Sequence, residues 1–559
     1  MADFTRNSFQ PLKHFSQVLM QQGRVQLDAD WNEQGAILLH YVRRLVAEAF
    51  PQGFGHGFGL SPLATQTAVT DDFAIGAGSY FVGGLLCELE GTPTAVLQTS
   101  VDNDRRRIKV AAWTLDGVPF TVGQYVEITN TATSPPVPLG TAKIVALDYS
   151  TTTLTLDRDV VPPANATLIA RRVVTFRSQP DPTEQLRLPS GDPAPLPTGK
   201  SQVYLDVWER IITPLEDDSI REVALDGADT AVRKRVVWQV RTAPYLLEAV
   251  RAPNPSTGGG QNVAGGGATL TNGGQDNGPV ACMMPQALEK LHRPLPAGLL
   301  RARTEPSQVS TDPCTISPES HFRGAQNQLY RVEIHTGSGN DAAPPTFKWS
   351  RENDSVKFAI AGPPSGGGGV ATVTLADLGR DERFGLALGD WVEIRDDRMV
   401  LTNTVMPLLQ VQSVDRMRST VTLAGNVPAG IDLSMHPVLH RWDQKATDPA
   451  EGGSDLAADG TVPIAAGTWI TLEDGVQVQF PAVDGVWFRP GDYWQIAARV
   501  TIGDVLWPNE SGRDANGNTI VNPIAQPPHG VQHYYAPLGV LTVDGGNAPH
   551  FNRCAAVAS

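Results

Sequence analysis

The sequence predicts a mainly β protein: a multidomain β-sandwich body, two small β-barrel repeats inserted into it, and an N-terminal α-helical arm. Glycine and proline are frequent, with 54 and 44 among 559 residues, and this favours many turns and short strands over long helices. Strand-like alternation of apolar and polar residues dominates from Asp72 onward, and one strand-rich segment occurs twice. A chain of this length exceeds one hydrophobic core, so we expect about three to five folded units.

The N-terminal region predicts a helical docking arm over residues 1–60. Within Leu27–Phe50 apolar residues recur near helical spacing, and Asp28, or Asp30 with Glu33, offers N-terminal capping chemistry. The apolar face of such a helix needs a cover, which is either the rest of the chain, the commoner arrangement, or a neighbouring subunit. The residues that we expect at an assembly interface are Gln22, Arg24, Leu27, Trp31, Tyr41, Val42 and Leu45.

The body is predicted from strands such as Val203–Asp217, where Val203, Leu205 and Val207 alternate with Tyr204, Asp206 and Trp208. We interpret these strands as antiparallel members of one or two sandwiches. The expected units are a first β-domain (61–98 and 173–250), a Gly/Asn-rich linker or loop (251–280), a second β-domain (281–362 and 440–545) and a C-terminal tail (546–559).

An internal repeat predicts the two inserted barrels, over residues 99–172 and 363–439. Val122–Ile128 (VGQYVEI) matches Leu388–Ile394 (LGDWVEI), and the match resumes downstream between Leu147–Val160 and Val414–Val427. About five short strands within roughly 70 residues suit a small closed barrel, which has no exposed sheet edge. Because side chains alternate along a strand, Glu127 and Glu393 should face solvent or neighbouring side chains rather than serve catalysis.

Charge and composition narrow the partners. The formal net charge is −15, so phosphate backbones and anionic lipid are repelled, and we expect no nucleic acid and no membrane insertion. No apolar stretch near the N-terminus has the length of a signal peptide, which predicts synthesis in the cytoplasm. The four cysteines lie far apart without a CxxC pair, so the sequence predicts neither a disulfide scaffold nor a zinc ribbon, and favours a reducing cytoplasm.

The sequence predicts no catalytic site and no cofactor. Phosphate-binding loops, nucleophile elbows and Ser-x-x-Lys motifs are absent from it. His529 and His533 are spaced by four residues, as zinc ligands on a helix are, but Pro527, Pro528 and Gly530 exclude a helix. They are therefore weak metal candidates, and hydrogen-bonded core or interface histidines are the commoner alternative.

A glycan-cleaving enzyme would need two carboxylates about 5–10 Å apart in a groove. Three pairs could serve, although 59 acidic residues produce such pairs by chance: Asp206 with Glu209, Glu473 with Asp474, and Asp484 with Asp492. The tryptophans at strand positions could stack on sugars, but such positions usually fill sandwich cores. These tryptophans are Trp208, Trp238, Trp349, Trp391, Trp469, Trp487 and Trp494.

Charged residues also interrupt apolar strands. The segments are Asp206–Arg210, Lys348–Asn353, Arg441–Asp443 and Arg489–Trp494. Buried Arg–carboxylate pairs are costly unless they are satisfied, so we interpret these segments as fixing strand register or subunit contacts.

The segment Val18–Gln34 (VLMQQGRVQLDADWNEQ) resembles the opening of a family of unassigned function that is encoded beside phage-tail-like contractile injection systems. The likeness continues in order through blocks such as Arg221–Val240, Phe347–Val356, Arg489–Pro508 and Pro527–Leu538. Departures are modest: this chain has Ala325–Arg331 (AQNQLYR) where a Glu is expected before the Asn, and Ile496–Arg499 (IAAR) where a proline is usual.

The resemblance implies a structural component of such a particle, in the baseplate, spike or tail-fibre region, and it assigns no catalytic residues. It further implies other particle components as partners, a trimeric or hexameric homo-oligomer, and intracellular assembly of a particle that is then released. One alternative is a tailspike that binds a receptor or surface glycan or degrades polysaccharide. Another is a cargo effector, for which the sequence shows neither a catalytic constellation nor a basic leader.

Overall fold

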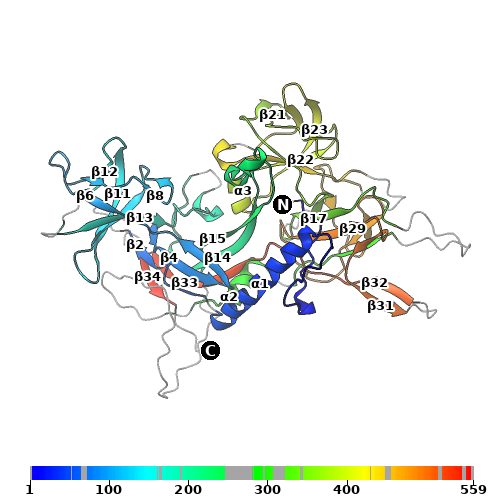
Figure 1. Ribbon diagram of the computed structural model, residues 1–559, viewed down its shortest axis with the longest axis horizontal. Helices are drawn as coiled ribbons and strands as arrows, with labels where there is room; N and C mark the ends of the chain where they lie inside the picture. The colour runs from blue at the N-terminus through cyan, green and yellow to red at the C-terminus, as the bar shows by residue number, and fades with distance from the viewer. Residues whose placement is uncertain are drawn as a thin grey trace, which may run out of the picture. The chain divides into compact units, whose positions relative to one another are not determined.

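The computed structural model describes residues 3–559 except 52, 64–71, 160–161, 163–165, 189–191, 246–279, 281, 294–295, 306–320, 340–343, 429, 447–454, 514–518, 544–548 and 555–559 (Figure 1). Strands make up 43% of the structure and helical residues 11%, which confirms the mainly β class. The chain divides into two compact units. Unit 1 comprises Met1–His40, Glu209–Arg235 and Lys290–Gln532, and unit 2 comprises Tyr41–Trp208, Val236–Glu289 and His533–Ser559.

The elements up to residue 292 are α1 (Asp28–Ala49), β1 (Phe54–Gly55), β2 (Leu60–Pro62), β3 (Phe73–Ile75), β4 (Gly78–Val82), β5 (Leu85–Leu89), β6 (Pro93–Gln98), β7 (Arg107–Val110), β8 (Thr114–Leu115), β9 (Val118–Pro119), β10 (Tyr125–Asn130), β11 (Val137–Asp148), β12 (Thr153–Leu156), β13 (Leu168–Thr175), β14 (Gly199–Ile212), β15 (Arg233–Pro244) and α2 (Pro285–His292). Those after it are β16 (Arg301–Thr304), β17 (Gln328–Thr336), β18 (Thr346–Ser350), β19 (Lys357–Ala359), β20 (Ser365–Gly367), β21 (Val370–Thr374), β22 (Trp391–Arg395), α3 (Asp397–Leu401), β23 (Leu408–Asp415), β24 (Thr420–Ala424), β25 (Val438–Trp442), β26 (Val462–Pro463), β27 (Trp469–Thr471), β28 (Val476–Gln479), β29 (Tyr493–Arg499), β30 (Asp504–Leu506), β31 (Asn509–Arg513), β32 (Thr519–Pro523), β33 (Tyr534–Val543) and β34 (His550–Arg553).

Unit 2 contains a sheet in the order β15-β14-β33-β34 and a smaller sheet in the order β1-β4-β5. Both sheets contribute to one buried apolar cluster, to which β14 supplies Val203, Leu205 and Val207. The alternation predicted for β14 is therefore confirmed. Its other face is buried as well, with Tyr204 and Asp206 almost inaccessible to solvent.

The first copy of the repeat forms a cycle of paired strands in unit 2. The order is β10-β11-β12-β7-β6-β13, and β13 also pairs with β10, so the path of hydrogen-bonded neighbours returns to its start. Apolar side chains from these strands form a separate buried cluster that includes Ile108, Val126, Ile144 and Leu156.

The second copy, in unit 1, repeats this connectivity with β22-β23-β24-β21 and with β19-β25-β22. An isolated bridge between Ile360 and Leu375 joins the ends of β19 and β21, so these six strands also follow one another in a cycle. Strands in matching positions have matching neighbours, since β10 and β22 carry the repeated sequence motif in the two copies. The internal repeat found in the sequence is thus repeated in strand order.

The body of unit 1 contains a five-stranded sheet in the order β26-β18-β17-β29-β30 and a three-stranded sheet in the order β16-β28-β27. Both sheets supply side chains to one apolar cluster, in which Trp494 and Phe480 are fully buried. The charged residues of β17 and β18 lie outside this cluster and are described below.

The N-terminal arm holds a single helix longer than one turn, which corrects the prediction of a helical arm over residues 1–60. Helix α1 spans 22 residues, within one residue of the predicted Leu27–Phe50 at either end. The described residues before it form only one short 3-10 turn, Pro11–Lys13. Pro51 follows the helix, as expected for a residue that cannot continue it.

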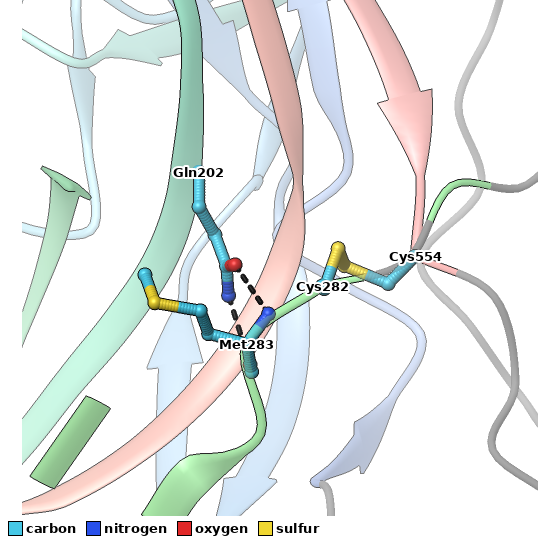
Figure 2. The surroundings of a disulfide bond; sticks show 4 residues. All are labelled: Gln202, Cys282, Met283 and Cys554. Atoms are coloured by element: carbon cyan, nitrogen blue, oxygen red, sulfur yellow. Dashed lines mark hydrogen bonds between the residues drawn. A yellow bond between two sulfur atoms is a disulfide. The ribbon is translucent and has the colours of Figure 1, made fainter. Parts of the chain in front are cut away.

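Cys282 and Cys554 form a disulfide, which corrects the prediction drawn from cysteine spacing (Figure 2). The two residues are 272 positions apart in sequence, but their Cα atoms lie 5.4 Å apart. Strand β34 ends beside residue 280, and the bridge between Val280 and Cys554 brings the sulfurs together. Sequence spacing could not show this, because the pairing depends on which strand edge the C-terminal segment reaches.

Some predictions lie wholly or mostly outside the described residues. Of the predicted linker 251–280 only residue 280 is described, and of the tail 546–559 only residues 549–554. In the part of the chain that is described, no helix is both long and apolar enough to cross a membrane.

The disulfide generates a prediction about stability. Replacing both Cys282 and Cys554 with serine should lower the free energy of unfolding by about 2–5 kcal/mol, because the crosslink closes a long loop. Denaturant unfolding of the oxidised protein and of the double variant measures the difference. Recovery of a disulfide-linked peptide pair containing these two cysteines from a non-reducing digest is the accompanying control, and its absence would contradict the pairing.

Candidate functional site

The most densely charged region of the described chain lies in unit 1, where β17, β18 and β22 each contribute buried ionisable side chains. Arg331 and Glu333 are two residues apart on β17 and therefore share a face, as do Glu393 and Arg395 on β22. Lys348 on β18 is the direct cross-strand partner of Glu333. We call these five residues the ion cluster.

Lys348 lies between two carboxylates. Its Nζ forms an ion pair with Glu393 and lies 3.6 Å from Glu333 Oε1. Arg331 Nε donates to Glu333 Oε2 at 2.8 Å, and Arg395 Nε donates to Glu393 Oε1 at 2.9 Å. Arg395 Nη2 also reaches Glu333 Oε1 at 3.4 Å, so each carboxylate of the cluster contacts more than one cation.

Two aromatic side chains contact the charged groups of the ion cluster. Trp442 Nε1 donates to Glu393 Oε2 at 3.0 Å, while Lys348 Nζ lies 4.3 Å from the centroid of the same tryptophan. Arg331 stacks on Tyr493 at 3.6 Å. Hydrogen bonds and cation–π contacts offset part of the cost of removing these charges from water.

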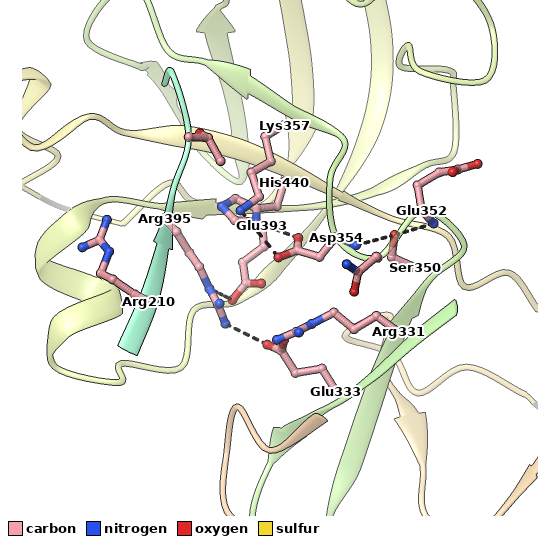
Figure 3. A network of polar contacts seen from close by, with 12 residues as sticks. Arg210, Arg331, Glu333, Ser350, Glu352, Asp354, Lys357, Glu393, Arg395 and His440 are labelled. Carbon is pink, nitrogen blue, oxygen red and sulfur yellow. Dashed lines mark hydrogen bonds and ion pairs between the residues drawn. The ribbon is translucent and has the colours of Figure 1, made fainter. Parts of the chain in front are cut away.

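A second group, centred on Asp354, borders the ion cluster (Figure 3). His440 Nδ1 lies 2.9 Å from Asp354 Oδ1, and Lys357 Nζ lies 3.6 Å from Asp354 Oδ2. His440 also pairs directly with Glu393 across β25 and β22. The two groups thus form one continuous polar layer between the strands of the second cycle and the five-stranded sheet.

The electrostatics favour charged carboxylates here. Burial alone would raise the pKa of Glu393, but Arg395 and Lys348 lower it to about 2. Burial would likewise raise the pKa of Glu333, yet Arg331 and Lys348 lower it. Burial and Lys357 lower the pKa of His440 to about 4, so this imidazole is neutral at pH 7. The carboxylates therefore stay ionised and paired over the whole neutral range.

The ion cluster links neighbouring strands through ion pairs and hydrogen bonds. Its charged atoms contact one another, and it joins β17 and β18 to β22 and β25 within unit 1. Ion pairs also join Arg441 to Asp443 (3.1 Å) and Arg293 to Asp492 (3.0 Å), in two of the segments where the sequence mixes charged with apolar residues. Glu393, expected to face solvent or neighbours, faces neighbours, while its counterpart Glu127 is half-buried.

The two histidines proposed as weak metal candidates have separate partners. His529 Nδ1 accepts a hydrogen bond from the Gln495 backbone N–H at 3.0 Å, and burial lowers the pKa of His529 to about 4. His533 Nδ1 lies 2.6 Å from Asp206 Oδ1, and its ring stacks on Trp208. Among the described residues no group of three or more His, Cys, Asp or Glu side chains could hold a metal ion.

At least one carboxylate of each candidate pair is bound by basic or hydroxyl groups, since Asp492 pairs with Arg293 as described above. Asp206 contacts Arg241 at 3.4 Å, in addition to His533. Glu473 accepts from Arg351 Nη2 at 2.7 Å and from Tyr330 Oη at 3.2 Å. Burial raises the pKa of Glu473 to about 7 even though Arg351 opposes the shift, so this carboxyl titrates near neutral pH.

Of the seven strand tryptophans, four are buried and three are half-buried. Trp208, Trp238, Trp349 and Trp494 are buried in the core, as expected of sandwich positions. The others, Trp391, Trp469 and Trp487, are partly accessible.

The seven predicted interface residues of the arm are all exposed, and five of them lie on the single helix α1 or directly before it. The arm begins on unit 1, where the Thr5 N–H donates to Asp28 Oδ2 at 2.9 Å and Arg499 Nη2 donates to the Thr5 carbonyl at 2.7 Å. Burial would raise the pKa of Asp28, but the hydrogen bonds from Thr5 lower it. The start of α1 is therefore fixed by polar contacts, while the apolar side chains of the predicted set remain accessible.

Several residues of these two regions were not among the site residues predicted from the sequence. Leu38 is exposed on the same side of α1 as the predicted set, and the seven-residue spacing from Trp31 and Leu45 could have identified it. Glu333 and Arg395 sit inside apolar strands whose charge alternation was visible, but their pairing across strands distant in sequence was not.

Comparison with known families gives one match. The sequence profile of DUF6519, described as a family of unknown function, matches residues 1–103, 196–253 and 246–556. The matched segments leave out residues 104–195, which hold β7 to β13 of the first cycle. None of the curated proteins compared with the chain shows significant similarity to it.

The ion cluster generates a prediction with an internal control. Replacing Glu393 with glutamine should lower the free energy of unfolding by about 3–5 kcal/mol, because Lys348 and Arg395 lose their buried counter-charge. The same change at Glu127, the matching position of the first cycle, should stay within about 0.5 kcal/mol. Denaturant unfolding measures the free energy of unfolding of both variants. Equal losses would show that the ion cluster does not stabilise the fold more than the matching position of the first cycle does.

Glu473 generates a pH prediction. Its pKa is raised by folding, so its favourable contribution is present at low pH and is lost as the pH rises through about 7. Glu473→Gln should therefore become more stable relative to the wild type between pH 5 and pH 8, by about 1–3 kcal/mol. Asp484→Asn, at an exposed carboxyl of the same unit, serves as the control. Parallel stability–pH curves for the wild type and Glu473→Gln would refute the assignment.

Proposed function

The chain belongs to the DUF6519 family, and we propose that it is a structural component of a phage-tail-like contractile injection particle, in the baseplate, spike or tail-fibre region. It would act by protein–protein assembly. The observation that carries this proposal is the exposed apolar stripe along α1.

The stripe is large for a single helix. Trp31 is 81% exposed, Leu38 57% and Leu45 71%, and Tyr41 and Val42 are exposed beside them. The helix buries Ala29 and Ile37, which at about 100° per residue lie about 180° and 100° around the helix from Leu38. A helix that turns one side to its own chain and a second, apolar side to solvent has a surface that a partner must cover.

The spacing of the stripe favours another copy of the same helix as that partner. Trp31, Leu38 and Leu45 recur every seven residues and can be assigned to position a of a coiled-coil heptad. Leu27 and Tyr41, each four residues before one of them, then occupy position d, the other apolar position of the heptad. A seven-residue period is the pattern of a coiled-coil seam, where identical helices pack knobs into holes. Closed symmetry would then give a homo-oligomer, for which we expect a trimer or hexamer.

The rest of the chain suits a rigid part. We interpret the two sheets of each unit as sandwiches, and each cycle of six strands as a small closed barrel without exposed edges. The ion cluster would hold the second barrel to its sandwich through several simultaneous contacts.

The assignment to an injection particle is supported by the sequence resemblance, which extends in order over most of the chain. It carries with it the expectation that the particle assembles inside the cell and is later released. The alternative role is a tailspike that recognises or degrades a glycan. One surface feature of the first cycle, treated in the next subsection, concerns glycan recognition alone and is compatible with either role.

Substitutions on the stripe test the proposal. Leu38→Glu with Leu45→Glu places two charges in the seam and should reduce incorporation into sedimented particles at least about tenfold, since buried unpaired charge is strongly unfavourable. Asn32→Glu, on an exposed flank of the same helix, should incorporate as the wild type does. Circular dichroism of both variants checks that the fold is kept. Normal incorporation of the double variant would refute a docking role for α1.

A further inference from the structure

An exposed aromatic pair lies on the first cycle of strands. Trp113 and Tyr149 have ring centroids 4.9 Å apart and planes inclined by 67°. Trp113 is 37% exposed and Tyr149 53%. We propose that this pair is a binding site for the pyranose rings of a polysaccharide, a role that goes beyond assembly and does not depend on it.

The chain fixes the backbone on both sides of the pair. Trp113 precedes the tight β8–β9 hairpin, and its carbonyl accepts from the Phe120 N–H at 2.8 Å. Next to it, the Ala112 N–H donates to Thr94 Oγ1 at 3.0 Å. Trp113 is therefore held before any ligand arrives, which reduces the entropy lost on binding.

Tyr149 occupies a turn that is held just as firmly. Asp148 Oδ1 accepts from the Ser150 N–H at 3.0 Å, and Thr151 Oγ1 donates to Asp148 Oδ2 at 2.7 Å. These bonds lower the pKa of Asp148 to about 2. The turn lies beside Trp113 because β7 and β12 pair, with the Val110 N–H donating to the Thr152 carbonyl at 3.0 Å.

The chemistry of the pair matches that of a sugar ring. A pyranose has an apolar C–H face and a polar rim of hydroxyls, so it is complementary to an aromatic face bordered by polar groups. Because the two rings are inclined to each other, a sugar could stack on the face of one ring while the other ring contacts its side. Ser150 and Thr151 are both exposed at the border, and their hydroxyl oxygens, which donate to Asp148, can still accept a hydrogen bond from a sugar hydroxyl.

Nucleic acid, the other ligand that stacks on aromatic rings, fits this place less well. Its binding needs cations for the phosphates. Arg105, Arg106 and Arg107 lie at the start of β7, at the end of the strand opposite to Trp113, and two of them pair with acids: Arg106 with Asp104 at 3.0 Å, and Arg107 with Asp102. Arg172 on β13 is engaged by the β8–β9 hairpin, where its Nη2 donates to the Val118 carbonyl at 2.6 Å. Lys109 is the cation of β7 nearest to the pair in sequence.

The second cycle provides a comparison within the same chain. Its matching turn, after Asp415, has Arg416 in the position of Tyr149, and Met417 in that of Ser150. The second cycle lies within the match to the family profile, whereas Trp113 and Tyr149 lie in the segment left out of it. The aromatic pair is thus confined to the copy that departs from the family pattern.

The test uses the full-length protein on an array of purified bacterial capsular, O-antigen and plant cell-wall polysaccharides, with a single-stranded oligothymidylate as the stacking control. We expect binding to at least one polysaccharide, and affinity electrophoresis in that polysaccharide then gives relative affinities. Trp113→Ala and Tyr149→Arg, which introduces the residue of the second cycle, should each weaken binding about tenfold or more. Arg416→Ala should leave it unchanged.

The array contains both neutral and acidic polysaccharides, so it shows which of the two kinds supplies the pyranose rings. Binding to either kind supports the site. The proposal is overturned if no polysaccharide binds, if only oligothymidylate binds, or if Tyr149→Arg binds as the wild type does. Thermal unfolding of Trp113→Ala, compared with Tyr149→Arg, separates loss of binding from loss of fold. Because the arm is untouched in these variants, particle incorporation should be unaffected, so this test and that of the assembly role can fail independently.

Discussion

The organisation of unit 1 depends on the ion pairs that Lys348, fully buried, forms with Glu333 and Glu393. A lone ammonium at this depth would be prohibitively costly, and so would either carboxylate without it. Each charge is tolerable only because the others are in place, so the strands that carry them must meet in one register. The second cycle of strands is inserted between β18 and β26 of the five-stranded sheet. An apolar contact would fix the cycle against the sheet less strictly, because apolar packing has no directional preference. The ion cluster therefore trades stability for a defined geometry, which suits a part that must fit others.

The same principle separates the interior of the chain from its surface. Inside, ionisable side chains pair with one another, and Asp206 and Glu473, which belong to two of the candidate carboxylate pairs, are bound by arginine, histidine or tyrosine. Outside, apolar side chains gather where the chain does not need them for its own core, along α1 and at Trp113 with Tyr149. One surface has the heptad spacing of a self-complementary helix and the other has the mixed apolar and hydroxyl character of a sugar site. Assembly and recognition would thus use separate parts of the chain.

Much of the local structure was predictable from the sequence, because it follows from periodicity. The helix over Leu27–Phe50, the alternation of β14 and the repeat at Tyr125 and Trp391 all appear within single segments, and all are present. What could not be predicted were contacts between segments far apart. The disulfide of Cys282 and Cys554, the partners of Lys348, and the meeting of Trp113 with Tyr149 each depend on strand order, which local patterns do not encode. The exposure of the α1 stripe lies between these cases, since its spacing was visible but its lack of cover was not.

The central claim is that the stripe of α1 is covered by the same helix of other copies. The most direct measurement is the mass of the purified full-length chain in solution, by native mass spectrometry over a range of concentrations. The account predicts a single closed species at an integer multiple of 59.9 kDa, three or six copies being expected from the symmetry of such particles. A species of 59.9 kDa at every concentration would contradict it.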